Sequence, residues 1–355
     1  MEYGNSIHQQ VEEQLGDDEN MSQWFIKDKH VESMSPLCDL RASFEQRTGG
    51  LTTLERLTNQ IGCSPSGFMC EDDLRADMIS ARTGLSRVTS EEETDVDHPD
   101  IKTPWDVLDY LPELLLYDLE QAEHLGNEFS TKTVGENKID VHSSATIFPG
   151  VILDATLGPI RIEGNSVIRP NAVLCGPCWI GKNSTVVDSA LIKQNTVLGP
   201  HCRVGGEVGG TVFQGYSNKS HGGHLGDSVV GEWVNFGAGT TNSNLLNTYA
   251  DVIVTDLSGK RHRTGRQFVG CFVGDHVKFS ICSRIMTGTL VGTGSMISTS
   301  SIVPSPTRRF AWITDSGERT YRVDKFIEVA RTVMKRRDVH LNESSEAILR
   351  DLAEE

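Results

Sequence analysis

A short polar stretch of the chain concentrates side chains that could act on a substrate. Two histidines, His221 and His224, lie three residues apart, and Tyr216, Asn218 and Lys219 come just before them. An imidazole has an ordinary pKa near ~6.5, so either ring can accept a proton at neutral pH and act as a general base. The alternative, two solvated loop histidines without a role, stays open at this point. No third ligand stands near the pair in sequence, so we expect no zinc site.

These side chains interrupt a regular repeat. Aliphatic residues recur every six positions, and the fourth residue after each one is usually small. This period is typical of a β-helix, in which each hexad forms one short strand and three hexads close one coil. Glycine and asparagine near the corners tolerate the backbone angles that turning requires. The aliphatic positions are Val141, Ile147 and Leu153; then Ile162, Ile168, Leu174, Ile180, Val186, Ile192, Leu198 and Val204; then Val230 and Phe236; then Val273, Phe279, Ile285, Val291, Ile297 and Val303.

The repeat breaks twice. Between Val204 and Val230 the phase of six fails, and we interpret this segment as a loop that leaves the coil and carries polar groups to the surface. A second break, residues 244–267, contains a Ser-Gly turn signal and predicts a β-hairpin. The hairpin is basic in an acidic chain, so it could bind ligand phosphates. A solvated hairpin or a contact with a neighbouring subunit is an equal alternative. Its cations are Lys260, Arg261, Arg263 and Arg266.

Composition limits the class of protein. The net charge of −16 argues against nucleic acid or an anionic membrane as the main partner. The start of the chain has no apolar leader, and no stretch approaches 18 apolar residues, so we expect a cytoplasmic protein without a membrane span. Aromatic residues make up only 6% of the chain and glycines number 34, which suits the thin layers of a solenoid.

The pattern also divides the chain into segments. Apolar residues at helical spacing precede the repeat and follow it, and an acidic stretch poor in apolar residues separates the first helix from the N-terminal part. The predicted segments are a disordered tail over 1–22, a reduced α/β segment over 23–85, an acidic linker over 86–104, a helix and connection over 105–136, the β-helix over 137–305 and a helical cap over 306–355.

One cysteine spacing suggests redox chemistry. Cys175-Gly-Pro-Cys178 has the spacing of a thioredoxin-like pair. Such a pair should begin a helix, whose N-terminus lowers the pKa of the thiol. Here it lies between two hexads, and the repeat explains Cys178 as a small interior residue.

The repeat resembles the hexapeptide-repeat acyltransferase superfamily, whose coils wind left-handed. Residues 216–244 resemble, more narrowly, the acetyltransferase half of the bifunctional sugar-1-phosphate nucleotidyltransferase/acetyltransferases (the N-acetylglucosamine-1-phosphate uridyltransferase/glucosamine-1-phosphate acetyltransferases). They share a Lys-x-His-x-x-x-Leu-Gly-Asp element from Lys219 and an Asn-x-Gly-Ala-Gly-Thr…Asn element from Asn235 to Asn244. The resemblance covers about residues 160–303. It implies a mainly β protein: a single-stranded left-handed parallel β-helix with a reduced N-terminal α/β segment and C-terminal capping helices.

The resemblance also implies a function. It predicts an acyltransferase that uses acetyl-CoA as co-substrate to N-acetylate an amino-sugar phosphate or nucleotide sugar. His221 matches the catalytic histidine of the family and would take the amine proton. The expected substrate-binding residues are Tyr216, Lys219, His224, Asn235 and Asn244; the expected contacts to the coenzyme are Lys260, Arg263 and Arg266. The resemblance further implies a homotrimer, with the donor held between adjacent subunits.

Two departures from the family pattern bear on this prediction. The lysine that follows the equivalent of Asn244 in the family is missing here. Residues 36–56 resemble the opening of a sugar nucleotidyltransferase domain, but a Gly-rich phosphate loop and a clear carboxylate pair for Mg²⁺ are missing. We therefore expect no nucleotidyl transfer, and Mg²⁺ only if that activity survives. The alternatives are a nucleotidyltransferase with the β-helix as scaffold, and a non-catalytic solenoid that binds a sugar nucleotide or a partner.

Overall fold

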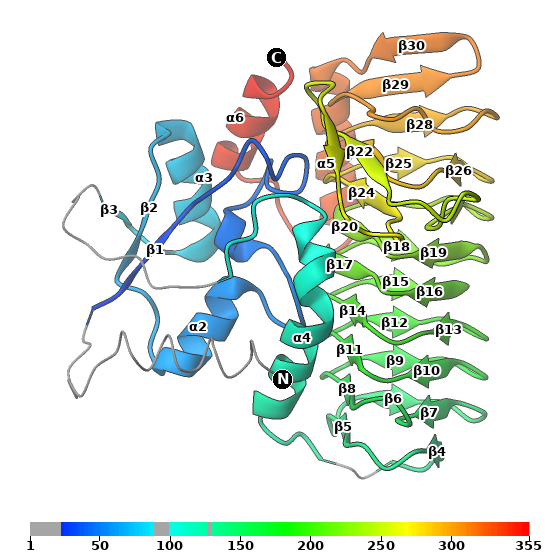
Figure 1. The fold of residues 1–355 in the computed structure, drawn as a ribbon. Coiled ribbons are helices and arrows are strands. Elements are labelled where there is room, and N and C mark those ends of the chain that lie inside the picture. The colour runs from blue at the N-terminus through cyan, green and yellow to red at the C-terminus, as the bar shows by residue number, and fades with distance from the viewer. Residues whose placement is uncertain (1–22, 89–98, 127–128, 355) are drawn as a thin grey trace.

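The computed structural model describes residues 23–88, 99–126 and 129–354. The tail predicted over 1–22 and most of the predicted linker lie outside these residues. Figure 1 shows a long β-helix with an α/β segment packed along one side and the C-terminal helices beside its last coils. The mainly β fold with its parallel β-helix, reduced α/β segment and capping helices is confirmed. The left-handed sense of winding is the one that the resemblance implies.

Three faces of parallel strands form the β-helix, and each strand pairs with the equivalent strand one coil away. The first face contains β5 (Ile139–Val141), β8 (Ile160–Ile162), β11 (Cys178–Ile180), β14 (Thr196–Leu198), β17 (Val212–Gly215), β20 (Val229–Glu232), β24 (Cys271–Val273) and β27 (Thr289–Val291). The second contains β6 (Thr146–Ile147), β9 (Val167–Ile168), β12 (Thr185–Val186), β15 (Arg203–Val204) and β18 (Asn218–Lys219), and continues through a bridge at Asn235 to β25 (Lys278–Phe279) and β28 (Met296–Ser298). The third contains β4 (Lys132–Val134), β7 (Ile152–Asp154), β10 (Val173–Cys175), β13 (Leu191–Ile192), β16 (Glu207–Gly209) and β19 (His224–Gly226), followed by the pair β21 (Thr241–Asn242) and β26 (Arg284–Ile285).

The hexad aliphatics fill the interior of these coils. Ile162, Ile180 and Leu198 pair in register on β8, β11 and β14, and all three are fully buried. Burial of such a side chain contributes about 1.5–3 kcal/mol relative to exposure, so the stacked rows account for the stability of the coil. Cys178 lies in the same interior, and burial raises the pKa of its thiol far above the ordinary value. This burial agrees with the interpretation of Cys178 as a small interior residue and not with a redox pair.

The predicted loop between Val204 and Val230 is also wrong. The chain stays in the coil there, because Val204 pairs with Lys219 and Val208 pairs with Leu225. The period of six fails because the connections between successive strands become shorter, while the strands keep their register. The segment that leaves the coil comes later. It is the antiparallel hairpin of β22 (Ile253–Thr255) and β23 (Arg261–Arg263), in the second predicted break.

The N-terminal segment folds as a small α/β layer. Its parallel sheet has the order β1 (Phe25–Lys27), β2 (Gly67–Met69), β3 (Arg87–Val88), and its helices are η1 (Ser43–Glu45), α2 (Thr53–Ile61) and α3 (Asp73–Thr83). The side chain of Thr52 accepts a hydrogen bond from the Glu55 amide and starts α2, and Gly62 ends it in the left-handed conformation. The helix α4 (Asp106–Gln121) connects this layer to the β-helix. It shares a buried apolar cluster with outward side chains of the first face, such as Trp179 and Phe272, so that face is covered.

The C-terminal part covers the last coils. The strand β29 (Ala311–Thr314) continues the second face and turns back into β30 (Gly317–Thr320). The helix α5 (Val323–Lys335) buries Phe326, Ile327, Ala330 and Met334, and α6 (Glu343–Asp351) follows it. None of the helices in the described ranges is long and apolar enough to span a bilayer.

Candidate functional site

A ladder of rings runs along one corner of the β-helix. Successive coils place a residue there in the left-handed conformation, which asparagine tolerates well, and the early coils use Asn165 and Asn183. Later coils use aromatic rings, and these stack in the order His201, Tyr216, Trp233 and His276. The ring centroids of Tyr216 and Trp233 are 4.3 Å apart. The faces of these two rings are therefore occupied by each other and by their neighbours in the ladder, which leaves only ring edges for a ligand.

A cavity of about 610 Å³ opens between this corner and the end of α5. Such a volume suits a small-molecule ligand. Its lining includes three of the predicted site residues, Tyr216, His221 and Asn235. The other polar or aromatic residues of the lining are Asp188, Arg203, Asn218, Ser220 and Trp233 from the coils, and Arg336 and Arg337 from the end of α5.

Of the other three predicted substrate contacts, His224 and Asn244 lie around the corner, on the third face. His224 belongs to β19, and its Nδ1 is 3.6 Å from Oε1 of Glu207. Asn244 donates a hydrogen bond of 2.5 Å to Asp227, a carboxyl whose pKa is raised by burial although this hydrogen bond opposes the rise. A Cβ on Gly226 would lie 2.7 Å from the His224 ring and 2.8 Å from the Asn244 amide, so both side chains cover this glycine. The structure thus divides the predicted set into two groups, on either side of the turn that carries His221.

That turn is narrow and open to solvent. His221 is exposed, and a Cβ on Gly222 would meet no neighbour within 4 Å. Gly223 has a φ of +121°, and a Cβ there would lie 2.1 Å from the carbonyl oxygen of Thr240. Only glycine fits at this position, so the close approach of the next coil fixes the path of the chain just after His221.

Lys219 fixes the turn from inside. Its side chain occupies an inward position next to Val204 and is only 2% exposed. The ammonium donates hydrogen bonds to the carbonyl oxygens of Gly223 (2.7 Å), His221 (3.1 Å) and Gly205 (3.1 Å). Burial lowers the pKa of Lys219 to about 8. In this position the side chain reaches the backbone of the turn rather than the cavity, so it acts as a positioning residue for His221.

Replacing Lys219 with methionine should change how stability depends on pH. A lysine whose pKa is lowered by folding binds its proton more tightly in the unfolded chain, so the wild type should gain stability as pH rises from about 8 to 10. We expect the free energy of unfolding in urea to rise over this interval by up to about 3 kcal/mol more in the wild type than in Lys219→Met. The control is Lys182→Met, at an exposed lysine of the same β-helix. Parallel pH curves for the wild type and Lys219→Met would contradict this assignment.

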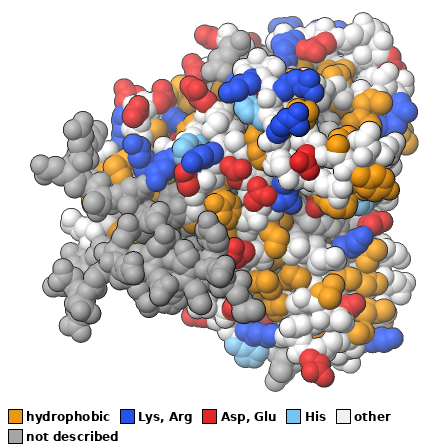
Figure 2. Space-filling view, in the orientation of Figure 1, with side chains coloured by type: hydrophobic (Ala, Val, Ile, Leu, Met, Phe, Trp, Pro, Cys, Tyr) orange, Lys and Arg blue, Asp and Glu red, His pale blue; other side chains and the backbone are white. Residues whose placement is uncertain are grey.

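The basic hairpin lies elsewhere. The ring of His262 on β23 is 5.3 Å from that of Trp105, at the start of α4, and Arg266 forms an ion pair with Asp109. Figure 2 shows Lys and Arg side chains gathered on the upper part of this face, in the region of the hairpin. None of the predicted coenzyme contacts, Lys260, Arg263 and Arg266, lines the cavity. Their contact with the coenzyme stays a prediction.

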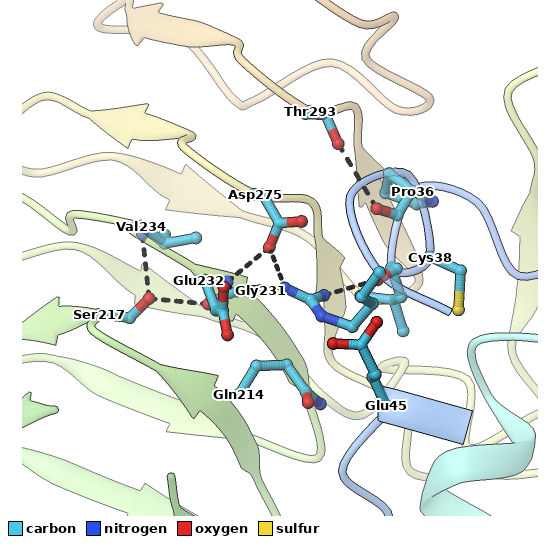
Figure 3. A network of polar contacts seen from close by, with 12 residues as sticks. Pro36, Cys38, Glu45, Gln214, Ser217, Gly231, Glu232, Val234, Asp275 and Thr293 are labelled. Atoms are coloured by element: carbon cyan, nitrogen blue, oxygen red, sulfur yellow. Dashed lines mark hydrogen bonds and ion pairs between the residues drawn. The ribbon is translucent and has the colours of Figure 1, made fainter. Parts of the chain in front are cut away.

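The segment that resembles a nucleotidyltransferase is packed against the rest of the protein. Arg41 is 1% exposed; its Nη2 is 2.7 Å from Asp275 and 3.6 Å from Glu232, and its Nη1 donates to the carbonyl of Leu37. Figure 3 shows the carboxylates of the β-helix coils beside the loop that contains Pro36 and Cys38. Arg56 forms a bidentate pair with Asp118 of α4, at 2.7 and 2.8 Å. These two guanidinium groups are therefore neutralised by carboxylates of the protein itself.

The glycines of this segment have no free space beside them. A Cβ on Gly49 would lie 2.5 Å from Asp118, and one on Gly50 would lie 2.2 Å from the Trp179 ring. The backbone contacts α4 and the first face directly, where a nucleotide-binding loop would need an open side for phosphates. Among the described residues, no group of three or more His, Cys, Asp and Glu side chains could hold a metal ion.

No protein-family model matches the chain. It is 30% identical over 208 residues to the bifunctional sugar-1-phosphate nucleotidylyltransferase/acetyltransferase of Sulfurisphaera tokodaii. The matched region covers 58% of this chain and 45% of that protein. It is also 30% identical over 206 residues to the bifunctional protein GlmU of Methanococcus maripaludis, covering 58% of this chain and 44% of that protein. Among solved structures, the chain is similar to the polysialic acid O-acetyltransferase OatWY. The match covers 54% of this chain and 87% of that structure, with 11% sequence identity. The TM-score of 0.23 is too low to support any argument.

The chain thus spans about half the length of the curated relatives it matches. The match agrees with the narrower of the two resemblances found in the residues. This chain is similar to the bifunctional sugar-1-phosphate nucleotidylyltransferase/acetyltransferases over a little less than half of their length.

Proposed function

We propose that this protein is an acyltransferase that moves an acetyl group from acetyl-CoA to the amine of an amino-sugar phosphate or a nucleotide sugar. The observation that supports it best is the cavity, which brings the exposed imidazole of His221 together with Asn235, Tyr216 and a cationic helix end. The similarity to the bifunctional proteins of S. tokodaii and M. maripaludis supports the same class of reaction.

The proposed reaction needs only a positioned base. The amine nitrogen of the acceptor attacks the thioester carbonyl, a C–N bond forms and the C–S bond breaks. His221 accepts the proton that the nitrogen loses, and the leaving sulfur of the coenzyme takes up a proton. Lys219 holds the His221 carbonyl and limits the motion of the turn, which favours a fixed distance between base and amine. Asn235 offers its amide in the same cavity, and Tyr216 offers the edge of its ring. His224 and Asn244 would contact a part of the substrate that extends onto the third face.

The two alternatives receive less support. A nucleotidyltransferase needs free cations for the phosphates, whereas Arg41 and Arg56 of the N-terminal segment are paired with carboxylates and its glycines Gly49 and Gly50 are covered. Mg²⁺ is therefore no part of the proposal. A purely binding solenoid would not need an exposed imidazole on a turn whose backbone is held by a buried lysine. The experiment that separates it from an enzyme is release of coenzyme A thiol in the presence of amino sugars.

We also propose a homotrimer, as the resemblance implies. Large apolar side chains are exposed near β26, among them Ile281, Met286 and Ile302, at 69%, 45% and 49%. Figure 2 shows further hydrophobic side chains exposed along the β-helix. Such side chains favour contact with another subunit. Light scattering at micromolar concentration should give the mass of three chains, and the mass of one chain would count against a donor site shared between subunits. Because acetyl-CoA is a metabolite of the cytoplasm, we keep a cytoplasmic location as part of the proposal.

A further inference from the structure

The cavity beside His221 is cationic in a strongly acidic protein. Arg203 comes from β15, whereas Arg336 and Arg337 come from the end of α5, more than a hundred residues later. Within the described residues none of the three has a carboxylate partner at ion-pair distance. The one acidic side chain of the lining, Asp188, pairs with Arg169 at 3.2 Å. The cavity therefore holds an excess of positive charge that the protein itself does not neutralise.

The three guanidinium groups are placed by the fold. Phe326 packs against the rings of His276 and Phe310, which holds the first part of α5 along the aromatic ladder. The helix thereby brings its C-terminal end over the coils of β15 and β18. There Nη2 of Arg337 donates a 3.1 Å hydrogen bond to the side-chain oxygen of Asn218. Arg203 and Arg336 are exposed, so their donors are free to meet a ligand.

The other walls of the cavity select the ligand. The faces of Tyr216 and Trp233 are covered within the ladder, so a nucleotide base has no free aromatic face there on which to stack. The cavity is also lined by the polar edges of the Tyr216 and Trp233 rings and by the amides of Asn218 and Asn235. These groups can form hydrogen bonds with the hydroxyl groups of a ligand. A guanidinium binds a phosphate through two parallel charge-assisted hydrogen bonds. The cavity therefore fits a small phosphorylated polyol better than the adenine end of a coenzyme.

We infer that Arg203, Arg336 and Arg337 bind the phosphate of the acceptor sugar, while its amine lies toward His221. This inference rests on the proposed function. The sequence lacks the family lysine after the equivalent of Asn244, and the C-terminal helix supplies cations from a different part of the chain. The capping helix α5 is then part of the substrate site as well as a cover for the last coils.

The test is calorimetric titration of the full chain with three probes: glucosamine 1-phosphate, unphosphorylated glucosamine and coenzyme A. We expect the wild type to bind the sugar phosphate more tightly than the sugar. The double variant Arg336→Gln/Arg337→Gln should weaken binding of glucosamine 1-phosphate by roughly 100-fold, because each charge-assisted hydrogen bond contributes about tenfold or more. Its affinity for coenzyme A should not change. The matched control is Lys335→Gln, which removes one charge from the same helix outside the cavity and should leave all three affinities unchanged.

Three results would overturn the inference. The wild type could fail to prefer the phosphorylated sugar; the double variant could keep its affinity for glucosamine 1-phosphate; or it could lose affinity for coenzyme A alone, which would assign the arginines to the phosphates of the donor. A thermal melt of each variant verifies that the fold is intact. Because the readout is binding, it separates the two proposals. Arginine-dependent binding of the sugar phosphate without any acetyl transfer would uphold the site and refute the proposed function.

Discussion

Replacing His221 with alanine is expected to lower turnover roughly 10²–10⁴-fold on an accepted amino sugar, which is the usual contribution of a general base. The imidazole is exposed in the cavity, and the carbonyl of the same residue is held by Lys219. The measurement is the steady-state rate of thiol release from acetyl-CoA. The KM for acetyl-CoA should change little, because the proposed role of His221 is proton transfer and not donor binding.

Two further measurements make this prediction specific. The wild-type rate should rise with pH and then level off, because only the unprotonated imidazole can accept the amine proton, and His221→Ala should lose this rise. The comparison variant is His224→Ala, on the third face, which should lower turnover much less if His224 only orients the sugar. Near wild-type turnover in His221→Ala would show that the proposed base is wrong, and His224 would become the next candidate.

Replacing Arg41 with methionine is expected to destabilise the protein by about 3–5 kcal/mol, because it leaves the buried carboxylate of Asp275 without a counter-charge. The guanidinium of Arg41 lies between Asp275 and Glu232, inside the contact between the N-terminal segment and the β-helix. The measurement is the free energy of unfolding in urea at pH 7. A loss below about 1 kcal/mol would show that the contact does not hold the two parts together.

The pH dependence of this contact gives a second readout. Burial alone would raise the pKa of Glu232, but the guanidinium groups of Arg82 and Arg41 outweigh burial and lower it. A carboxyl whose pKa is lowered by folding stabilises the protein above its ordinary pKa, and this stability is lost as pH falls through the lowered pKa. The difference between the wild type and Arg41→Met should therefore shrink at acid pH. The double variant Arg41→Met/Asp275→Asn should recover part of the loss, because one buried charge is removed together with its partner.

The residues that form the coil could be read from the sequence, because one aliphatic side chain per hexad must enter a narrow interior. Ile162, Ile180 and Leu198 show this directly. The turn that carries His221 could also be identified from the sequence. The reason is different: the motif that begins at Lys219 is local and continuous. The error over residues 204–230 has a physical cause. Shorter connections shift the phase of six without ending the strands, and periodicity alone cannot distinguish a short corner from a loop that leaves the coil.

The other half of the cavity could not be predicted. Arg336 and Arg337 lie in a helix that the sequence identifies only as a cap, and their approach to Arg203 depends on how α5 packs along the ring ladder. One signal was present in the sequence. The corner position occupied by Asn165 and Asn183 becomes His201, Tyr216 and Trp233 in the coils that form the cavity. A search that followed the corner residues as well as the aliphatics would have marked these coils as unusual. Lys219 gave no such signal, because a lysine before a histidine motif suggests a substrate contact and not an interior donor.

The central claim is tested most directly by following thiol release from acetyl-CoA with the purified full chain and a panel of acceptors. The panel should contain glucosamine 1-phosphate, other amino-sugar phosphates, amino-sugar nucleotides and, as controls, the same sugars without the amine or without the phosphate. The account predicts release that requires both the amine and the phosphate, together with a new N-acetyl product of matching mass. Release that is independent of the amine, or no release above the hydrolysis of acetyl-CoA with any member of a broad panel, would contradict it.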